Sequence, residues 1–432
     1  MPKASPAYPA TTYVLTAPPA PDAPPLNGDT RAAVAIIGGG YTGLSTALHL
    51  AEAGTDCLLL EAGPLARGAS GRNGGQVNPG LKIEPGEAYE KFGRAAGGRL
   101  VRLAGEAPAY VFDLIRRHGI ECEAARNGTI RVVRRESEAA MIAGTIADWA
   151  KEGVTLDRLE GTALQVGLGT ANYPLGVLDR RGGSVNPLGY ARGLAAAAAR
   201  AGARLHGKSK VQRLTPSGNG AWLVETAAGR VLADRVVLAT NGYSDDLWPG
   251  VRRSVVPFFS AIAATEPLPS PLRARILPGR QVAYESSWRV MYWRIDAQGR
   301  LLMGGPGVQR ETADPAHYRH LVACALGLYP DLKNVCWTHH WCGQVAVSDD
   351  HLPHIHELAP GLLAALGYTG RGIALATVMG RELALRLGGA APDELAFPVT
   401  PLQPIRFHRF WRPVASLTTW SAALRDRING LV

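Results

Sequence analysis

One stretch near the start of the chain limits the fold more than any other: AAVAIIGGGYTGLSTALHLAEAGTDCLLLEAG, residues 32–63. It begins as an apolar strand, passes through a glycine-rich turn, becomes a helix and returns to an apolar strand. Strand, turn, helix and strand in this order form a βαβ unit, whose two strands lie parallel in one sheet. We therefore expect a Rossmann-like α/β domain at this end of the chain.

The turn carries glycines at the spacing G-x-G-x-x-G, at Gly38, Gly40 and Gly43. The first allows a tight turn, the second lets backbone approach a pyrophosphate, and the third lets the helix pack closely on the sheet. The helix predicted over residues 41–53 directs its first N–H groups at the phosphates. Glu61 ends the second strand, where its carboxylate can accept hydrogen bonds from both ribose hydroxyls. The expected ligand is a dinucleotide.

FAD and NAD both fit this unit. The segment that follows distinguishes between the two cofactors; it is GPLARGASGRNGGQVNPGL, at residues 63–81. An NAD-binding domain would normally continue into another βα unit, whereas this segment is polar and rich in glycine. Arg67, Ser70 and Arg72 are candidates to hold phosphate or ribitol oxygens, and residues 73–75 allow backbone to lie beside a flat ring. The segment favours FAD.

Together these motifs resemble the D-amino-acid oxidase-like FAD-dependent oxidoreductases, and within them most closely the gamma-glutamylputrescine oxidase branch. The resemblance extends to GGSVNPLGYARGLAAAAARAGARLH, RVVLATNGY, ATEPL, YWRIDAQGRLLMGG and GYTGRGIALATVMGRELA, and covers about residues 10–430. It implies an FAD-binding domain of the glutathione-reductase type and a substrate domain whose antiparallel sheet covers the flavin. The expected fold class is α/β joined to α+β.

The two domains are expected to alternate along the chain. We predict an extended arm at 1–30, an FAD-binding domain at 31–90, 180–248 and 355–395, a substrate domain at 91–179 and 249–354, and a tail at 396–432. Predicted helices are 88–117, 136–151, 186–201 and 373–387. Predicted strands are 203–214, 221–226, 231–239, 255–266, 282–303 with a hairpin at 296–299, and 362–366.

Motifs and resemblance give one set of FAD contacts. The set is Gly38, Gly40, Tyr41, Thr42, Gly43, Glu61, Ala62, Arg67, Ser70, Arg72, Asn73, Gly74, Gly75, Gln76, Val211, Thr240, Asn241, Gly242, Gly367, Gly370, Arg371, Gly372 and Ile373. The resemblance implies that the helix start near Gly372 faces the N1–C2=O edge of the flavin, where a positive helix end and Arg371 favour the reduced cofactor. The alternative is a plain glycine turn with a surface arginine. For Val211 the alternative is that its side chain packs in the hydrophobic core.

Substrate contacts are expected on the strand beneath the hairpin. Tyr292 and Arg294 share one side of it, and an arginine there can fork onto a carboxylate. In the amino-acid oxidases that arginine lies nearer the turn, where this chain has Asp296. The predicted catalytic set is Arg371, Arg294, Tyr292 and Gln76. The predicted pocket wall is Tyr284, Trp288, Trp341 and Gln344, with core packing as the alternative for its aromatic members.

Residues 336–356, CWTHHWCGQVAVSDDHLPHIH, hold two Cys, five His and two Asp, but match no four-ligand zinc spacing. No metal is expected. The position of Cys342, about two dozen residues before the glycine loop, is similar to that of the cysteine that monomeric sarcosine oxidases bond to the flavin 8α carbon. That resemblance makes covalent attachment at Cys342 the alternative to a non-covalent cofactor.

The composition of the chain limits which classes of partner and which cellular location are expected. The net charge of +10 comes from scattered basic residues without interleaved aromatics, which argues against a nucleic-acid partner. No apolar run could span a bilayer, and the opening residues lack the layout of a secretory signal. The five dispersed cysteines form no disulfide framework. A cytoplasmic location is expected.

The function implied is dehydrogenation of a C–N bond, with hydride passing from the carbon next to nitrogen to flavin N5, an imine as product, and O2 reduced to hydrogen peroxide. The resemblance suggests a gamma-glutamylated polyamine or another amine as substrate. Four alternatives stay open. They are an oxidase of a cyclic or N-alkyl amino acid such as L-pipecolate or sarcosine, a dehydrogenase using a quinone or partner acceptor, a tRNA-modifying flavoprotein, and a non-catalytic FAD binder.

Overall fold

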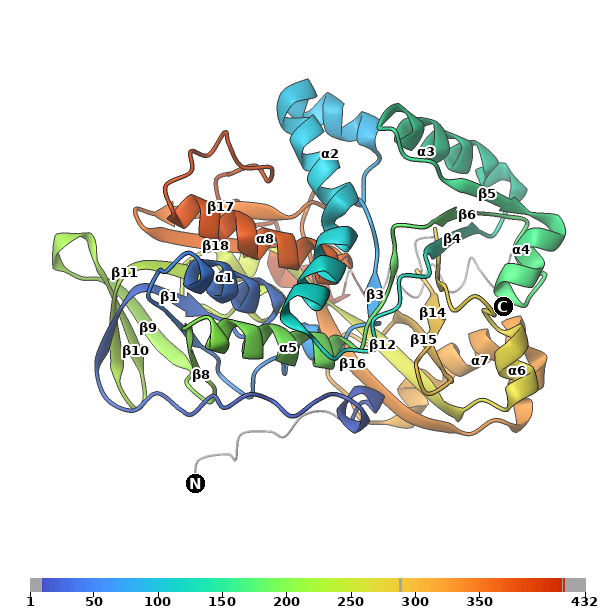
Figure 1. Ribbon diagram of the computed structural model, residues 1–432, viewed down its shortest axis with the longest axis horizontal. Helices are drawn as coiled ribbons and strands as arrows, with labels where there is room; N and C mark the ends of the chain where they lie inside the picture. The colour runs from blue at the N-terminus through green and yellow to red at the C-terminus, as the bar shows by residue number, and fades with distance from the viewer. Residues whose placement is uncertain (1–9, 287–289, 414, 416–432) are drawn as a thin grey trace.

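The computed structural model describes residues 10–286, 290–413 and 415 (Figure 1). Two sheets of eight strands organise this part of the chain. One lies at the left of Figure 1 and the other at the right, with helix α2 (Pro85–His118) standing between them. The mixture of a largely parallel and a largely antiparallel sheet confirms the predicted fold class.

The first sheet has the strand order β17-β18-β11-β1-β2-β8, and its other two strands, β10 and β9, extend from β11, because β10 pairs with β11 and β9 with β10. Its parallel strands are β1 (Thr30–Ile37), β2 (Cys57–Leu60), β8 (Arg204–His206), β11 (Arg230–Leu238) and β18 (Leu362–Leu366), and β17 (His354–Ala359) is antiparallel at one edge. All four residues of β2 are buried. Such continuous apolar runs are typical of parallel strands covered on both faces.

Helices and a hairpin provide that cover. The helices α1 (Tyr41–Glu52), α5 (Pro187–Arg200) and α8 (Gly372–Leu387) pack together on one face. On the other face the hairpin of β9 (Val211–Pro216) and β10 (Trp222–Thr226) packs against side chains of β1, β2 and β11. The sheet is thus a central layer, and the starts of α1 and α8, which follow β1 and β18, lie at its carboxyl edge.

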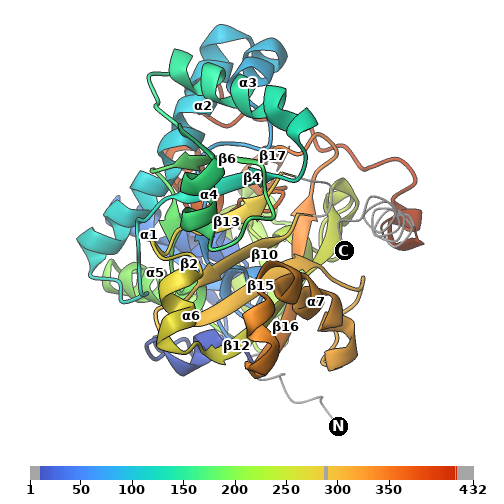
Figure 2. The ribbon, with the colours of Figure 1, turned by 90° about the vertical axis from the view of Figure 1, so that its right-hand side faces the viewer.

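The second sheet has the strand order β16-β12-β15-β14-β13-β4-β6-β5 (Figure 2). Its strands are β4 (Thr129–Val133), β5 (Asp157–Glu160), β6 (Leu175–Asp179), β12 (Val256–Pro267), β13 (Val282–Glu285), β14 (Tyr292–Ile295), β15 (Arg300–Pro306) and β16 (Trp337–Val347). Every pair is antiparallel except β4 with β13. That parallel pair brings together two chain segments that are far apart in the sequence, because strands of the first sheet lie between them along the chain.

Four helices surround this sheet: α3 (Ala139–Lys151), α4 (Gly161–Leu168), α6 (Ser270–Arg275) and α7 (Arg319–Leu328). A short pair, β3 (Gln76–Val77) with β7 (Gly183–Ser184), links the polar segment after β2 to the start of α5. No helix in the described ranges combines the length and the apolar character needed to cross a bilayer. The exact boundaries predicted between the two domains remain predictions.

Several predicted elements differ in detail. The strand expected over 203–214 is two strands, β8 and β9, because Lys208 adopts a left-handed conformation with φ of 51°. Helix α2 begins earlier than predicted, at a capping box made by Glu84 and Glu87, and is broken at Gly93, where φ is 73°. The strand expected over 282–303 is three strands, and its hairpin at 296–299 is present, with Gly299 at φ of 82°.

The predicted extended arm contains a short 3-10 helix, Thr12–Leu15, whose Tyr13 side chain is buried in the core of the first domain. Its phenol donates a hydrogen bond of 2.7 Å to the carbonyl of Asn73, and its ring meets Trp341 edge-on at 5.2 Å. The arm therefore supports the polar segment after β2.

Candidate functional site

A cavity of about 790 Å³ lies where the two sheets meet, and residues from both line it. One wall consists of the ends of β1, β2 and β11 with the segments that follow them. The opposite wall comes from the second sheet and includes Phe258, Ser260, Tyr292 and Gln344. The volume falls within the range of small-molecule and cofactor sites.

Two glycine-lined helix starts open onto this cavity, those of α1 and α8. At the first, a Cβ on Gly43 would lie 2.0 Å from the carbonyl oxygen of Gly38, so only glycine permits this contact. At the second, Gly370 has φ of 84°, which turns the chain into α8. Both helices thus present their first N–H groups, and the positive ends of their dipoles, to one space.

The carboxylate of Glu61 is fixed at the end of β2. Its Oε2 accepts a hydrogen bond from the Gly39 N–H at 2.7 Å, and its Oε1 accepts one from the Gly63 N–H at 2.9 Å. Glu61 lines the cavity beside the glycine turn. This is the place where a carboxylate meets the ribose of an adenosine in the predicted arrangement.

The polar segment after β2 folds tightly against the α1 start. Ser70 Oγ accepts from the Tyr41 N–H at 3.0 Å. The Asn73 amide donates to the carbonyls of Ala69 and Ser70, and its oxygen accepts from the Gly75 N–H at 2.9 Å. These bonds hold the segment in a single shape along the cavity.

Two arginines of this segment behave differently. The Arg72 guanidinium is engaged by protein, donating to Glu311 and the Tyr243 hydroxyl at 2.8 Å each and to the Cys342 carbonyl at 3.1 Å. Arg67 also lines the cavity, and its Nε is buried without a partner among the described residues. An unmatched cationic donor beside a glycine cradle fits the phosphates of a dinucleotide.

Most predicted cofactor contacts line this one cavity. They are Gly38, Gly40, Tyr41, Thr42, Glu61, Ala62, Arg67, Ser70, Arg72, Asn73, Gly74, Gln76, Val211, Thr240, Asn241, Gly370, Arg371, Gly372 and Ile373. Gly43, Gly75, Gly242 and Gly367 do not line it. They act through the backbone, as when the Gly367 N–H donates to Asn241 Oδ1 at 3.0 Å and ties two lining loops together.

Five of the predicted catalytic and substrate residues lie in the cavity wall, namely Gln76, Tyr284, Tyr292, Gln344 and Arg371. The Tyr292 ring lies over Gly74, and its hydroxyl shares a 2.9 Å hydrogen bond with Ser260. Burial raises the pKa of Tyr292 well above its ordinary value. Tyr292 is therefore a neutral wall residue rather than an acid or base at ordinary pH.

Arg294 does not line the cavity, in contrast to its predicted role as a carboxylate fork. Its Nε donates to the Gly74 carbonyl at 2.7 Å and its Nη2 to the Val185 carbonyl at 3.2 Å. The guanidinium lies behind the polar segment and supports it. Trp341 likewise faces that segment, donating from Nε1 to the Arg72 carbonyl at 2.8 Å. Trp288 lies outside the described residues.

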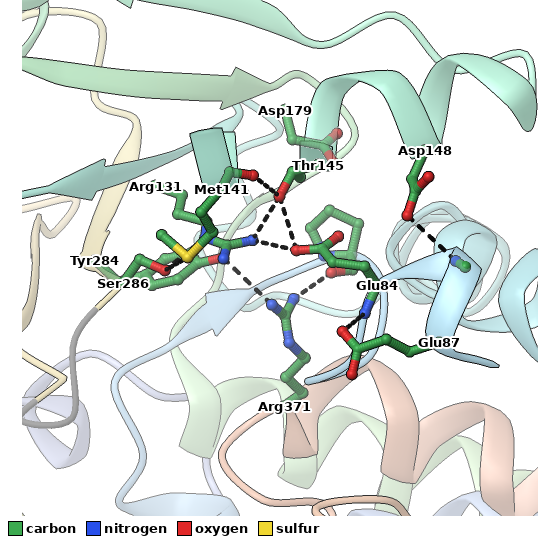
Figure 3. A network of polar contacts seen from close by, with 12 residues as sticks. Glu84, Glu87, Arg131, Met141, Thr145, Asp148, Asp179, Tyr284, Ser286 and Arg371 are labelled. Carbon is green, nitrogen blue, oxygen red and sulfur yellow. Dashed lines mark hydrogen bonds and ion pairs between the residues drawn. The ribbon is translucent and has the colours of Figure 1, made fainter. Parts of the chain in front are cut away.

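Arg371 lines the cavity, but its guanidinium points away from the α8 start (Figure 3). Nη1 donates to the Pro79 carbonyl, and Nη2 donates to the Tyr284 hydroxyl at 3.3 Å. The backbone of Arg371 thus stays at the helix start while its charge lies toward a second cavity, a division that the sequence did not indicate.

Cys342 faces the opposite side of β16 from Trp341. Its Sγ lies 3.9 Å from the Arg310 carbonyl oxygen, and its side chain packs in the core of the second sheet. The thiol does not line the cavity, and covalent flavin attachment at Cys342 stays an untested alternative. In the part of the chain that the structure describes, no group of His, Cys, Asp or Glu side chains is arranged to hold a metal ion.

Tyr368 and Lys82 are among the residues of the cavity wall that sequence reasoning missed. Tyr368 lies inside the second glycine motif, so its neighbours could have indicated it. Lys82 follows the polar segment and belongs to no motif. Its side chain is exposed to the space inside the cavity, and protein atoms surround that space. That burial, with the charges of Arg371 and Arg131, lowers the pKa of Lys82 to about 7.

Comparisons with known proteins agree with this geometry. Residues 33–386 match the FAD dependent oxidoreductase family. The chain is 36% identical to the "Probable oxidoreductase OrdL" of Rhizobium meliloti (strain 1021), over 88% of this chain and 89% of that protein. It is 31% identical to the "Gamma-glutamylputrescine oxidoreductase" of Escherichia coli (strain K12), over 94% and 95%.

Among solved structures, glycine oxidase from Geobacillus kaustophilus superposes with a TM-score of 0.71 at 25% identity, covering 87% of this chain and 99% of that chain. The family match covers the glycine turn, the polar segment and most of α8, which are the elements that shape the cavity. The chain belongs to the D-amino-acid oxidase-like family of FAD-dependent oxidoreductases, and its cofactor is FAD.

Proposed function

We propose that this protein is an amine oxidase, which converts a C–N single bond of its substrate to an imine and delivers the electrons to O2 as hydrogen peroxide. FAD supplies the two-electron chemistry. The observation that carries the proposal is the cavity itself, in which two helix starts of the FAD-binding part face a wall of the second sheet. A substrate held against that wall lies between the sheet and the cofactor.

The charge of the cavity prepares an amine for oxidation. Among its described lining residues the one carboxylate is Glu61, whereas Arg67, Arg72 and Arg371 carry positive charge. Such surroundings disfavour an ammonium group and lower the pKa of a bound amine. The amine is then neutral when it reacts, and no strong base is required.

The wall residues orient and enclose the substrate. Tyr292 and Tyr284 present aromatic rings, and Phe258 and Ile262 add apolar surface that excludes water. Orientation of this kind contributes a large share of rate in reactions whose bond chemistry belongs to a cofactor. The relatives named for gamma-glutamylputrescine and glycine support an amine or amino acid as the substrate class. We propose a gamma-glutamylated polyamine or a similar amine.

The test uses purified flavoprotein under anaerobic conditions with a panel of diamines, N-acyl diamines, glycine, sarcosine and L-pipecolate. We expect an N-acyl diamine to bleach the flavin absorbance, and readmitted air to restore it with one hydrogen peroxide per amine oxidised. Bleaching that only an added quinone reverses would instead identify a dehydrogenase. If no amine or amino acid bleaches the flavin, the proposal is wrong.

A further inference from the structure

A second cavity of about 420 Å³ adjoins the first. Four residues line both, namely Lys82, Tyr284, Val290 and Arg371. Since the same side chains form part of each wall, the two cavities meet at this junction. The second cavity lies between the start of α2, helix α3 and the strands β4, β6 and β13.

The wall beyond the junction is a polar network whose members satisfy one another (Figure 3). Arg131 forms an ion pair with Glu84 at 2.7 Å and donates to Ser286 Oγ at 2.9 Å. Thr145 donates to the same Glu84 carboxylate at 2.8 Å. The Glu84 charge is therefore neutralised by Arg131, and the network fixes the shape of this wall.

The other carboxylates in this wall are also engaged away from the junction. Glu285 pairs with Arg134 at 2.7 Å and Asp179 with Arg181 at 2.6 Å. The Glu138 carboxylate accepts from the backbone N–H of residues 134 and 135 at 3.1 Å each. None of these acids forms an ion pair with a residue of the junction.

The junction itself carries two cations without a counter-charge. In residues 10–286, 290–413 and 415, no carboxylate lies within ion-pair distance of Lys82 or Arg371, and Lys82 has no hydrogen-bond partner. The Nε of Arg371 is buried and also lacks a partner. Buried donors are nearly always satisfied in folded proteins. This buried donor and the uncompensated charge of Lys82, an exposed residue, at the meeting point of two cavities indicate a missing anionic partner.

We infer that the junction is a binding subsite for a carboxylate, and that the substrate is an elongated amine with that carboxylate at its far end. The inference rests on the proposed function, because the near end of the substrate is the amine oxidised in the first cavity. A carboxylate here accepts from Lys82 Nζ and Arg371 Nε and neutralises both charges. A free diamine would bring a further cation to the same place, so the subsite selects against it.

The lowered pKa of Lys82 agrees with this arrangement, since burial and the neighbouring arginines make its charge costly until an anion arrives. A gamma-glutamyl amide of a diamine is one molecule of the required kind. Any diamine acylated by a dicarboxylic acid of similar length has the same two ends.

The experiment compares two substrates of equal length, N-glutaryl-1,4-diaminobutane and N-pentanoyl-1,4-diaminobutane, of which the first alone ends in a carboxylate. We expect kcat/KM of the wild-type holoenzyme to be at least about tenfold higher for the glutaryl compound, mainly through KM. In Lys82→Met that preference is lost, measured as the ratio of the kcat/KM values for the two compounds. Lys82→Arg, which keeps the charge, recovers part of the preference.

A second measurement does not depend on turnover. N-butylglutaramate has the carboxylate but no oxidisable amine, and its binding to the holoenzyme is measured by calorimetry. Lys82→Met weakens this binding about tenfold, whereas Lys151→Met, an exposed lysine on α3, leaves it unchanged. Equal use of the two substrates by the wild type, or binding unaffected by Lys82→Met, overturns the subsite. If neither substrate is oxidised while N-butylglutaramate still binds through Lys82, the proposed function fails and the subsite stands.

Discussion

The side-chain hydroxyls of Thr42 and Tyr368 lie 2.6 Å apart, although 326 residues separate them in the chain. Thr42 belongs to the first turn of α1, and Tyr368 to the glycine loop before α8. Both side chains are buried in the wall of the large cavity. This hydrogen bond fixes the two glycine-lined helix starts relative to each other, as a single cofactor requires.

The pair can be tested by a double-mutant cycle with Thr42→Val and Tyr368→Phe. Each change removes one hydroxyl and leaves the other unsatisfied, which costs about 1 kcal/mol or about fivefold in FAD affinity. We expect the double variant to bind FAD about as well as either single variant, measured by titrating apoprotein with FAD. Losses that simply multiply would contradict a coupling between the two loops.

Gly43 tests the close contact between α1 and the first glycine turn. In Gly43→Ala the new Cβ would lie 2.0 Å from the Gly38 carbonyl oxygen and 3.3 Å from the Ile36 side chain, so helix and strand must separate. We expect a lower melting temperature and a loss of FAD affinity of about 100-fold or more. Gly144→Ala in α3, where a Cβ meets nothing within 4 Å, should leave both unchanged or raise stability slightly.

Tyr13 tests the support that the arm gives to the polar segment after β2. Tyr13→Phe removes the hydrogen bond to Asn73 and should weaken FAD binding by about fivefold. Tyr13→Ala also leaves a cavity beside Trp341, and should destabilise the protein by about 3 kcal/mol. Leu15→Ala is the matched control, because that side chain is 59% exposed on the same arm. Denaturant unfolding and FAD titration measure both effects, and FAD affinity that is insensitive to Tyr13 would exclude this role.

Lys82 tests the electrostatics of the junction through pH. Its folded pKa of about 7 lies below the ordinary value of 10.5, so the unfolded chain binds an extra proton between these values and stability rises with pH there. The cost of the buried charge is complete below pH 7 and absent above 10.5. Lys82→Met should therefore raise the melting temperature by about 2 °C at pH 6, with a gain that disappears toward pH 10. Lys151→Met should show no such trend, and a gain independent of pH would rule out this origin.

Local patterns predicted the parts of the site that depend on backbone. The spacing of Gly38, Gly40 and Gly43 and the loop ending at Gly372 determine where strands end and helices begin, so both helix starts were predictable. Side chains whose contacts join segments distant in the sequence were not predictable in this way. Alternation placed Tyr292 and Arg294 correctly on one side of β14. The segment at residues 73–75 lies between Arg294 and the cavity, however, and no local pattern contains that contact.

The same alternation argues against one pair of predictions. Trp341 and Cys342 are neighbours on β16 and must face opposite sides, so both could not lie against the cofactor. Lys82, by contrast, is a site residue that no sequence pattern could have predicted. It belongs to no repeating pattern, and its place at the junction depends on how α2, β4 and β13 pack together, two of which come from separate chain segments.

The most direct test of the central claim is the chromophore content of the purified protein. If both helix starts bind the same FAD, the protein carries one FAD per chain, shows the absorbance of an oxidised flavin, and releases all of it to the supernatant on acid precipitation because Cys342 faces away. A colourless protein that takes up no added FAD, or a yellow precipitate that retains its colour, would contradict this account.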